Sequence, residues 1–107
     1  MEIIEALEVF ASLSQETRLR VFKLLIEYGN DGLIPSAIAE RLKIPDNTLS
    51  FHLSHMTKAG LVTSKKNGRS ITYFASSSLT ENLIRYLKEN CCEKENRTSA
   101  SKKVRKC

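Results

Sequence analysis

The 107-residue sequence predicts a mainly α-helical domain with one small β-hairpin. Residues 35–42 have helical apolar spacing, and a second such segment begins near Asn47, just after Pro45. Two alternating segments, residues 61–64 and 70–75, flank an Asn-Gly pair, which is the strongest short signal for a hairpin turn. Two short helices, a tight turn and a basic hairpin in this order predict a winged helix-turn-helix, expected to form a homodimer.

Two further helices are expected ahead of this unit. Residues 2–13 carry a narrow apolar face suited to packing on the chain itself or on a partner, formed by Ile3, Leu7, Phe10, Ala11 and Leu13. Residues 14–16 offer an N-cap and an acidic side chain near a helix start, and the pattern then continues to a break at residues 29–32. This second helix is predicted to be the central core helix, with Leu19, Phe22, Lys23, Leu25, Ile26 and Tyr28.

Two prolines delimit the first helix of the helix-turn-helix pair. Pro35 has the backbone φ of a first helical turn, and apolar residues recur at helical spacing after it. Pro45 disfavours helical backbone at the residue before it, so this helix is expected to end after Leu42. Asp46 is expected to cap the next helix by accepting a bond from a backbone amide.

The second helix of the pair has an uncharged outer face. Its apolar stripe is predicted to consist of Leu49, Leu53 and Met56. The hydroxyl, amide and imidazole groups off this stripe suit base edges in a DNA major groove. The residues of the pair expected to contact DNA are Ser36, Asn47, Thr48, Ser50, Phe51, His52 and His55. The alternatives are an ordinary solvated surface helix and a metal site at the two histidines, which is disfavoured because DNA needs the same face.

The hairpin is basic. It carries Lys65, Lys66 and Arg69 and no acidic residue between positions 61 and 73, and Gly60 before it is expected to end the second helix as a C-cap. A hairpin of this kind positions a protein on the DNA backbone or minor groove more than it selects a sequence. The alternative is a hairpin that its lysines merely keep soluble.

A last helix is predicted over residues 79–92, capped by Ser77 or Ser78. Its apolar stripe is a natural dimer seam with the first helix and consists of Leu83, Leu87 and Cys91, flanked by Ile84 and Tyr86. Residues 1–92 are therefore expected to form the DNA-binding and dimerisation domain. Residues 93–107 contain too few apolar side chains to order themselves and are expected to be a flexible basic tail.

The net charge of +5 is unevenly distributed. Residues 93–107 contain six Lys or Arg and two Glu, a local charge of +4, which leaves +1 for the rest of the chain. The local cluster of Lys58, Lys65, Lys66 and Arg69 therefore supports DNA binding better than the total does.

Several classes of protein are disfavoured. No apolar run approaches the ~18 residues needed to span a bilayer, and the N-terminus, with its glutamates, is unlike a signal peptide. No membrane association and a cytoplasmic location are expected. An enzyme is not expected either, because the sequence contains no phosphate loop, no carboxylates paired in a pocket-like context and no Cys close to an activating His.

Four segments are distinctive as an ordered set. They are Ser14-Gln15-Glu16-Thr17-Arg18-Leu19, Thr48-Leu49-Ser50-Phe51-His52-Leu53, Lys58-Ala59-Gly60-Leu61-Val62, and Gly68-Arg69 ahead of Tyr73. Together they resemble the ArsR/SmtB family of bacterial metalloregulators, over residues 1 to about 92. The resemblance implies a dimeric winged-helix repressor that binds double-stranded operator DNA and is released by an inducer.

Three cysteines are the candidate inducer site. Cys91 and Cys92 look like the adjacent pair of arsenic-responsive family members, whose third cysteine follows a few residues later; here the third is Cys107. The resemblance implies that these three thiolates bind arsenite or antimonite as the inducer, with no catalytic cofactor. Structural zinc, in contrast, generally takes four N or S ligands. Two other inducer sites of the family lack ligands here, because residues 36–42 contain no Cys and residues 79–90 contain no His or Asp.

The cysteines allow other interpretations. They can form a redox switch, in which oxidation to a disulfide or persulfide links Cys107 to Cys91 or Cys92. The tail can also chelate a thiophilic ion in a module that does not bind DNA. Finally, Cys91, on the stripe of the last helix, and Cys92 beside it can each simply be a small buried hydrophobe.

Overall fold

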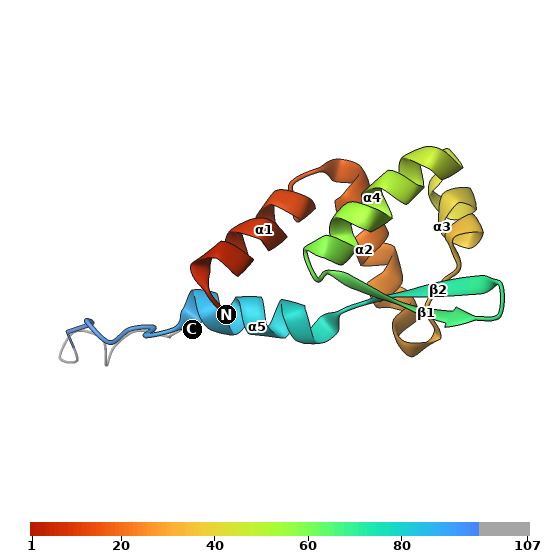
Figure 1. Ribbon diagram of the computed structural model, residues 1–107. Coiled ribbons are helices and arrows are strands. Elements are labelled where there is room, and N and C mark those ends of the chain that lie inside the picture. Colours follow the sequence, from red (N-terminus) through yellow and green to blue (C-terminus); the bar gives the residue numbers. More distant parts are fainter. Residues whose placement is uncertain (97–107) are drawn as a thin grey trace.

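The computed structural model describes residues 1–96 and shows a winged helix-turn-helix, as predicted (Figure 1). The elements follow in the order α1 (Ile3–Leu13), α2 (Glu16–Tyr28), η1 (Gly29–Asp31), α3 (Pro35–Leu42), α4 (Asp46–Lys58), β1 (Val62–Asn67), β2 (Ser70–Ala75) and α5 (Ser77–Lys88). Helices α1 and α5 lie at one end of the molecule and the tip of the hairpin lies at the other (Figure 1). No helix of residues 1–96 is long and apolar enough to cross a membrane.

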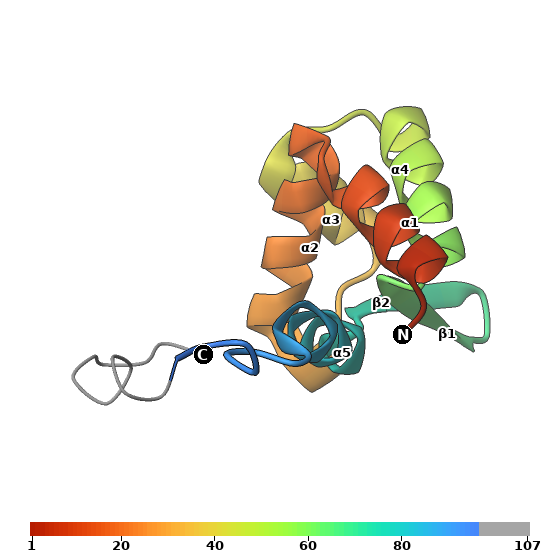
Figure 2. The ribbon, with the colours of Figure 1, turned by 90° about the vertical axis from the view of Figure 1, so that its left-hand side faces the viewer.

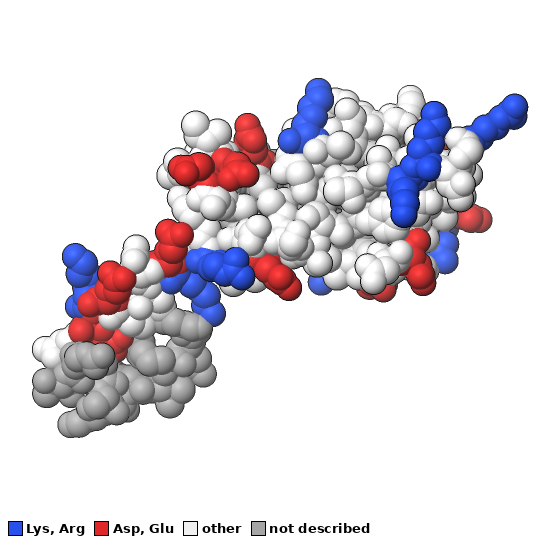
Figure 3. Space-filling view, turned by 60° about the horizontal axis from the view of Figure 1, so that its bottom comes forward, with Lys and Arg blue, Asp and Glu red and all other residues white. Residues whose placement is uncertain are grey.

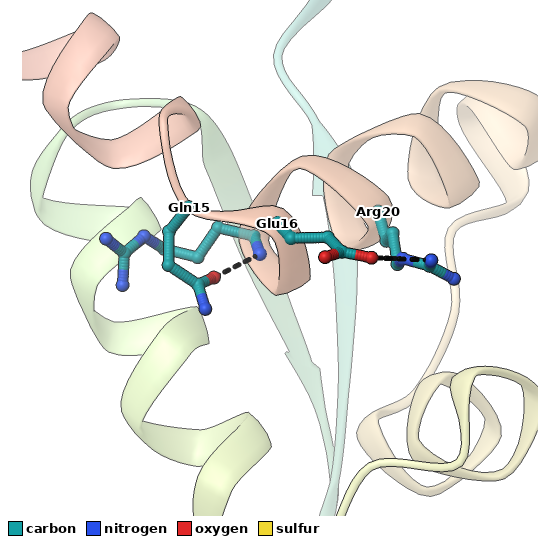
Figure 4. Close-up of polar contacts among 4 residues, drawn as sticks. Gln15, Glu16 and Arg20 are labelled. Atoms are coloured by element: carbon teal, nitrogen blue, oxygen red, sulfur yellow. Dashed lines mark hydrogen bonds and ion pairs between the residues drawn. The ribbon is translucent and has the colours of Figure 1, made fainter.

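Helix α2 is central, as expected, but its buried side differs from the prediction. The Gln15 side chain caps its start by accepting a hydrogen bond from the backbone N–H of Arg18 at 2.9 Å (Figure 4). The buried side of the helix consists of Arg18, Val21, Phe22 and Leu25. Leu19 and Ile26, which were expected in the core, are 45% and 41% exposed. They lie seven residues apart and therefore share a side of the helix that the domain does not cover.

The helix-turn-helix pair forms where the prolines predict it. Pro35 occupies the first turn of α3, and the helix ends at Leu42. Lys43 caps this end with a left-handed backbone, φ 56°. Helix α4 begins at Asp46, whose side chain makes no cap bond, so the predicted cap is wrong. Asn47 instead accepts a hydrogen bond from the backbone N–H of Thr48 at 2.9 Å.

The hairpin is longer than predicted. Strands β1 and β2 pair antiparallel from Val62 opposite Ala75 to Asn67 opposite Ser70, which leaves a two-residue turn. Gly68 in this turn has φ +64°, a left-handed conformation that favours glycine.

The chain before α3 is held against the hairpin. Backbone hydrogen bonds of 3.0 and 2.8 Å join Leu33 to Tyr73 in β2. At Gly32, a Cβ atom would lie 2.6 Å from the carbonyl oxygen of Tyr73, so only glycine permits this close approach. The helix-turn-helix and the hairpin are thereby fixed relative to each other.

Helix α5 is shorter than predicted. It is capped by Ser76, which accepts from the backbone N–H of Leu79 at 3.3 Å, and it ends at Lys88. Glu89 is extended and Asn90 is left-handed with φ 61°, a conformation that asparagine tolerates at helix ends. Cys91 and Cys92 therefore lie beyond the helix and are exposed, so the placement of Cys91 on the stripe and the interpretation of either cysteine as a buried hydrophobe are wrong.

The two helices at the end opposite the hairpin tip, α1 and α5, face the viewer in Figure 2. Both carry apolar side chains that the domain leaves uncovered. Helix α1 packs on the domain through its small side, Ala6, Val9 and Ser12. Of its predicted apolar face, Leu13 is half-buried against the core, whereas Ile3, Leu7 and Phe10 are exposed. Two residues of α5 are exposed as well, and the α1/α5 face consists of Ile3, Ile4, Leu7, Phe10, Ile84 and Leu87.

Candidate nucleic-acid interface

The outer face of α4 is exposed and carries no charged side chain between Asn47 and Ser54. Burial of Leu49, Leu53 and Met56 against the core directs the opposite side of the helix outward, as predicted. The exposed side chains of this face are Asn47, Thr48, Ser50, Phe51 and Ser54. Ser36, in the first turn of α3, is exposed as well. This face presents one amide, three hydroxyls and a phenyl ring, which are groups that contact base edges.

His52 does not lie on this outer face, contrary to expectation. Its side chain is 7% exposed, and its Nδ1 atom lies 3.1 Å from Nη1 of Arg18. Because arginine can only donate, Nδ1 accepts the bond and the ring proton of neutral His52 lies on Nε2. The residue follows Leu49 by three positions, which places it at the edge of the buried stripe.

His55 is also turned inward, although it is only half-buried. Its Nδ1 atom lies 3.0 Å from Oγ of Ser12, which is itself fully buried. The two histidines that were expected to contact DNA are therefore both hydrogen-bonded to the interior of the domain.

Arg18 connects three helices in a buried polar network with Ser12, His52 and His55. Its Nε donates to the carbonyl oxygen of Ser12 at 2.7 Å, and the side chain is 9% exposed. Ser12 belongs to the last turn of α1, where carbonyl groups lack partners within the helix. The network thus joins the end of α1 to the inner side of α4. Sequence patterns did not reveal this network, although an arginine on the same side of the helix as Val21, Phe22 and Leu25 was a usable signal.

Burial lowers the pKa of His52 below its usual value of 6.5, and the positive charges of Arg18 and His55 lower it further. The unfolded chain therefore takes up a proton at His52 more readily than the folded domain. We expect the contribution of neutral His52 to stability to be complete above pH 6.5 and to be lost as the pH falls through the lower folded-state pKa. Urea unfolding at pH 7.5 and pH 5 measures this effect.

The matched control for this pH dependence is His52→Gln, which keeps an acceptor for Arg18 but does not titrate. We expect the variant to lose less stability between the two pH values than the unsubstituted protein. Equal losses in the two proteins would show that another group causes the pH dependence.

The hairpin places its positive charges in the solvent. Lys65 and Lys66 lie in β1, opposite Thr72 and Ile71, so their side chains point to opposite faces of the hairpin. Arg69 is in the turn, and all three residues are exposed. Basic side chains project from the end of the molecule that carries the hairpin (Figure 3). The hairpin can therefore reach phosphate groups beside a groove that α4 enters.

The candidate inducer site lies at the other end, just after α5. The Sγ atoms of Cys91 and Cys92 are 3.3 Å apart, and both residues are exposed. Cys107, the third predicted ligand, lies outside the described residues. Within residues 1–96, no group of three or more His, Cys, Asp or Glu side chains is arranged to hold a metal ion.

Comparisons with known proteins agree with the fold and with a DNA-binding helix-turn-helix. Residues 13–65 match a helix-turn-helix domain family. The chain is 33% identical over 85 residues to the uncharacterized HTH-type transcriptional regulator MJ1325 of Methanocaldococcus jannaschii, an overlap of 79% of this chain and 93% of that protein. It is 34% identical over 61 residues to a putative arsenical resistance operon repressor ArsR of Halobacterium salinarum, covering 57% of this chain and 46% of that protein.

The likeness extends to the solved structure of an ArsR-like transcriptional regulator from Rhodococcus sp. RHA1. The TM-score is 0.77 at 33% identity, and the alignment covers 94% of this chain and 92% of that one. Sequence and structure thus agree over nearly the whole length of both proteins. The chain belongs to the ArsR/SmtB family of winged helix-turn-helix, DNA-binding transcriptional regulators.

Proposed function

We propose that this regulator is a dimeric repressor that arsenite or antimonite releases from its operator by binding to Cys91, Cys92 and Cys107. The observation that carries the proposal is the 3.3 Å separation of the Cys91 and Cys92 sulfur atoms, which is short enough for both to ligate one ion. Soft thiolate donors suit a soft trivalent ion. The similarity to a putative arsenical resistance repressor supports the same choice.

On the DNA side, α4 enters the major groove with its outer face. Base edges are contacted by Asn47, Thr48, Ser50 and Phe51. Ser36, in the first turn of α3, contacts the DNA backbone. His52 and His55 hold α4 from its inner side through Arg18 and Ser12, at 3.1 and 3.0 Å. Lys65, Lys66 and Arg69 bind phosphate groups and fix the position of the domain on the duplex.

The exposed hairpin charges lead to a test of the DNA-binding surface. We expect the triple substitution Lys65→Gln, Lys66→Gln and Arg69→Gln to weaken binding about a hundredfold at moderate salt, because a dimer would lose six phosphate contacts. The slope of log affinity against log salt concentration should become shallower, by about 0.9 for each lost contact. Fluorescence anisotropy with a labelled duplex from the region upstream of the gene measures both quantities.

A matched control removes basic charge from the opposite end of the domain. Arg85→Gln combined with Lys88→Gln neutralises two exposed residues in the last turn of α5. This variant should keep the salt slope of the unsubstituted protein. If the hairpin variant also kept that slope, the hairpin would not contact phosphate.

The dimer forms through the α1/α5 face. Ile84 and Leu87 are 51% and 58% exposed, and the exposed apolar residues of α1 lie at the same end of the molecule. A twofold axis through this face would cover these side chains in both copies and set the distance between the two α4 helices.

Release requires that the ion favours a conformation other than the DNA-bound one. The cysteine pair follows the end of α5 after Glu89 and Asn90, so an ion that draws its sulfur atoms together acts close to the α1/α5 face. Helix α1 is joined to α4 through Ser12 and Arg18, whose Nε to carbonyl oxygen distance is 2.7 Å. A change in the dimer face can therefore be transmitted through these contacts to α4, and it would alter the distance between the two α4 helices of the dimer.

The experiment is an arsenite titration of the protein–DNA complex in a phosphine reductant, which does not compete for arsenite as a thiol would. We expect arsenite to weaken DNA binding about tenfold or more, within the usual range of allosteric coupling. Cys91→Ser and Cys92→Ser should each abolish the response, and the same titration of Cys107→Ser measures the contribution of the third thiol. DNA binding that arsenite leaves unchanged would contradict the proposal.

The alternative is a redox switch, in which oxidation to a disulfide or persulfide links Cys107 to Cys91 or Cys92. The disulfide-bonded state of Cys91 in this structure favours it. In that case peroxide or a persulfide donor, without arsenite, would release the DNA, and excess reductant would restore binding. Release by arsenite that persists under full reduction distinguishes the ion sensor from this switch.

A further inference from the structure

We infer that Phe51 is a specificity-determining residue that packs its ring against the methyl group of a thymine in each operator half-site. The inference rests on the proposed entry of α4 into the major groove.

Phe51 occupies the middle of the outer face of α4. Its side chain is 64% exposed, nearly as much as the most exposed apolar residue of α1. The helical period places Asn47, Ser54 and Lys58, at four residues before and three and seven after, on the same side as the ring. Any duplex that meets this face meets the ring near its centre.

The ring is free to make such a contact. Its one aromatic neighbour among the described residues is His52, at 5.5 Å between centroids with the planes inclined by 66°, which leaves the ring otherwise uncovered. A single exposed apolar side chain is ordinary on a protein surface. This one, however, lies away from the α1/α5 face, on a part of α4 between Asn47 and Ser54 where the other exposed groups are a short amide and hydroxyls and none is charged.

The chemistry of the major groove selects the base. Thymine is the only standard base that presents a methyl group there, and apolar side chains such as phenylalanine pack against it. Asparagine and serine beside the ring can bond to neighbouring bases, so the ring adds a preference that hydrogen bonds cannot provide. Removing one buried methyl should weaken binding about fourfold, as expected for the transfer of one such group from water.

The test replaces thymine by deoxyuridine, which lacks only the methyl group. Duplexes that the full-length protein binds are first selected from a random pool, and each thymine of one half-site is then replaced in turn. Dissociation constants are measured for the unsubstituted protein, for Phe51→Ala and for a control variant, Ile26→Ala. Ile26 is 41% exposed on α2 and lies beside the base of the hairpin rather than on α4.

We expect one thymine of the half-site to respond to replacement. Its replacement should weaken binding of the unsubstituted protein and of Ile26→Ala about fourfold. It should not change the affinity of Phe51→Ala. The thermal midpoint of Phe51→Ala should be unchanged, because the ring packs little within the domain. Two results would overturn the inference: no thymine responds, or the responding thymine responds equally in Phe51→Ala. Failure to select any duplex would instead contradict the DNA-binding role of α4.

Discussion

Replacing Arg18 by alanine is expected to lower the free energy of unfolding by about 3 kcal/mol, a large share of the stability of a small domain. The substitution removes the 2.7 Å bond to the Ser12 carbonyl and the 3.1 Å bond to His52 Nδ1. Both acceptors lie in buried residues and would lose their partner, and the space of the guanidinium group would be empty. The urea midpoint, followed by circular dichroism, measures the loss.

Helix α2 provides a matched control in Arg20. This arginine pairs with Glu16 at 2.6 Å, but the two side chains are 65% and 75% exposed (Figure 4). Exposed pairs contribute little, so Arg20→Ala should change stability by about 0.5 kcal/mol or less. Similar losses in the two variants would contradict the structural role assigned to the Arg18 network.

A charge on the α1/α5 face is expected to separate the dimer. Leu7 is 58% exposed in the single chain and, in a twofold dimer, would be covered in both copies. Leu7→Asp therefore removes two apolar contacts and buries two carboxylates, which should raise the dimer dissociation constant at least about a hundredfold. Sedimentation velocity across a concentration series measures this change.

The control for this prediction is Ile26→Asp, which places the same charge at an exposed apolar residue of α2. It should leave the dissociation constant unchanged. Leu7→Asp should also weaken operator binding, because a monomer contacts one half-site instead of two. A variant that stays dimeric would show that the chains do not associate through this face.

The parts of the fold that could be predicted are those encoded by local chemistry. Pro35 and Pro45 mark the ends of the short helix because proline restricts the backbone itself and the residue before it. Asn67-Gly68 marks the hairpin because glycine adopts the left-handed φ that the turn requires. The apolar stripe of α4 was also readable, because helical periodicity directly separates the buried side from the exposed one.

The polar network could not be predicted in the same way. Arg18 and His52 are 34 residues apart, and their bond exists only because α2 and α4 pack together. Sequence spacing placed His52 off the apolar stripe, but it could not distinguish a polar residue with a buried partner from one in solvent.

At α1 and at the end of α5, apolar periodicity alone did not predict the structure. In α1 the stronger apolar pattern, which includes Ile3, Leu7 and Phe10, is exposed in the single chain, while the small residues Ala6 and Val9 pack inward. Periodicity reports that a side is apolar, not whether its own domain or a partner covers it. At the other end, the left-handed turn at Asn90 stops α5 before the cysteines, although the apolar spacing continues to Cys91.

The most direct test of the proposed coupling is the affinity of the reduced protein for arsenite, measured with and without saturating operator DNA. Linkage requires that the two ligands weaken each other by the same factor. If arsenite lowers DNA affinity tenfold, DNA must lower arsenite affinity tenfold, and Cys91→Ser must remove both effects. An arsenite affinity that is the same for the free and the DNA-bound protein would contradict release by ion binding at the end of α5.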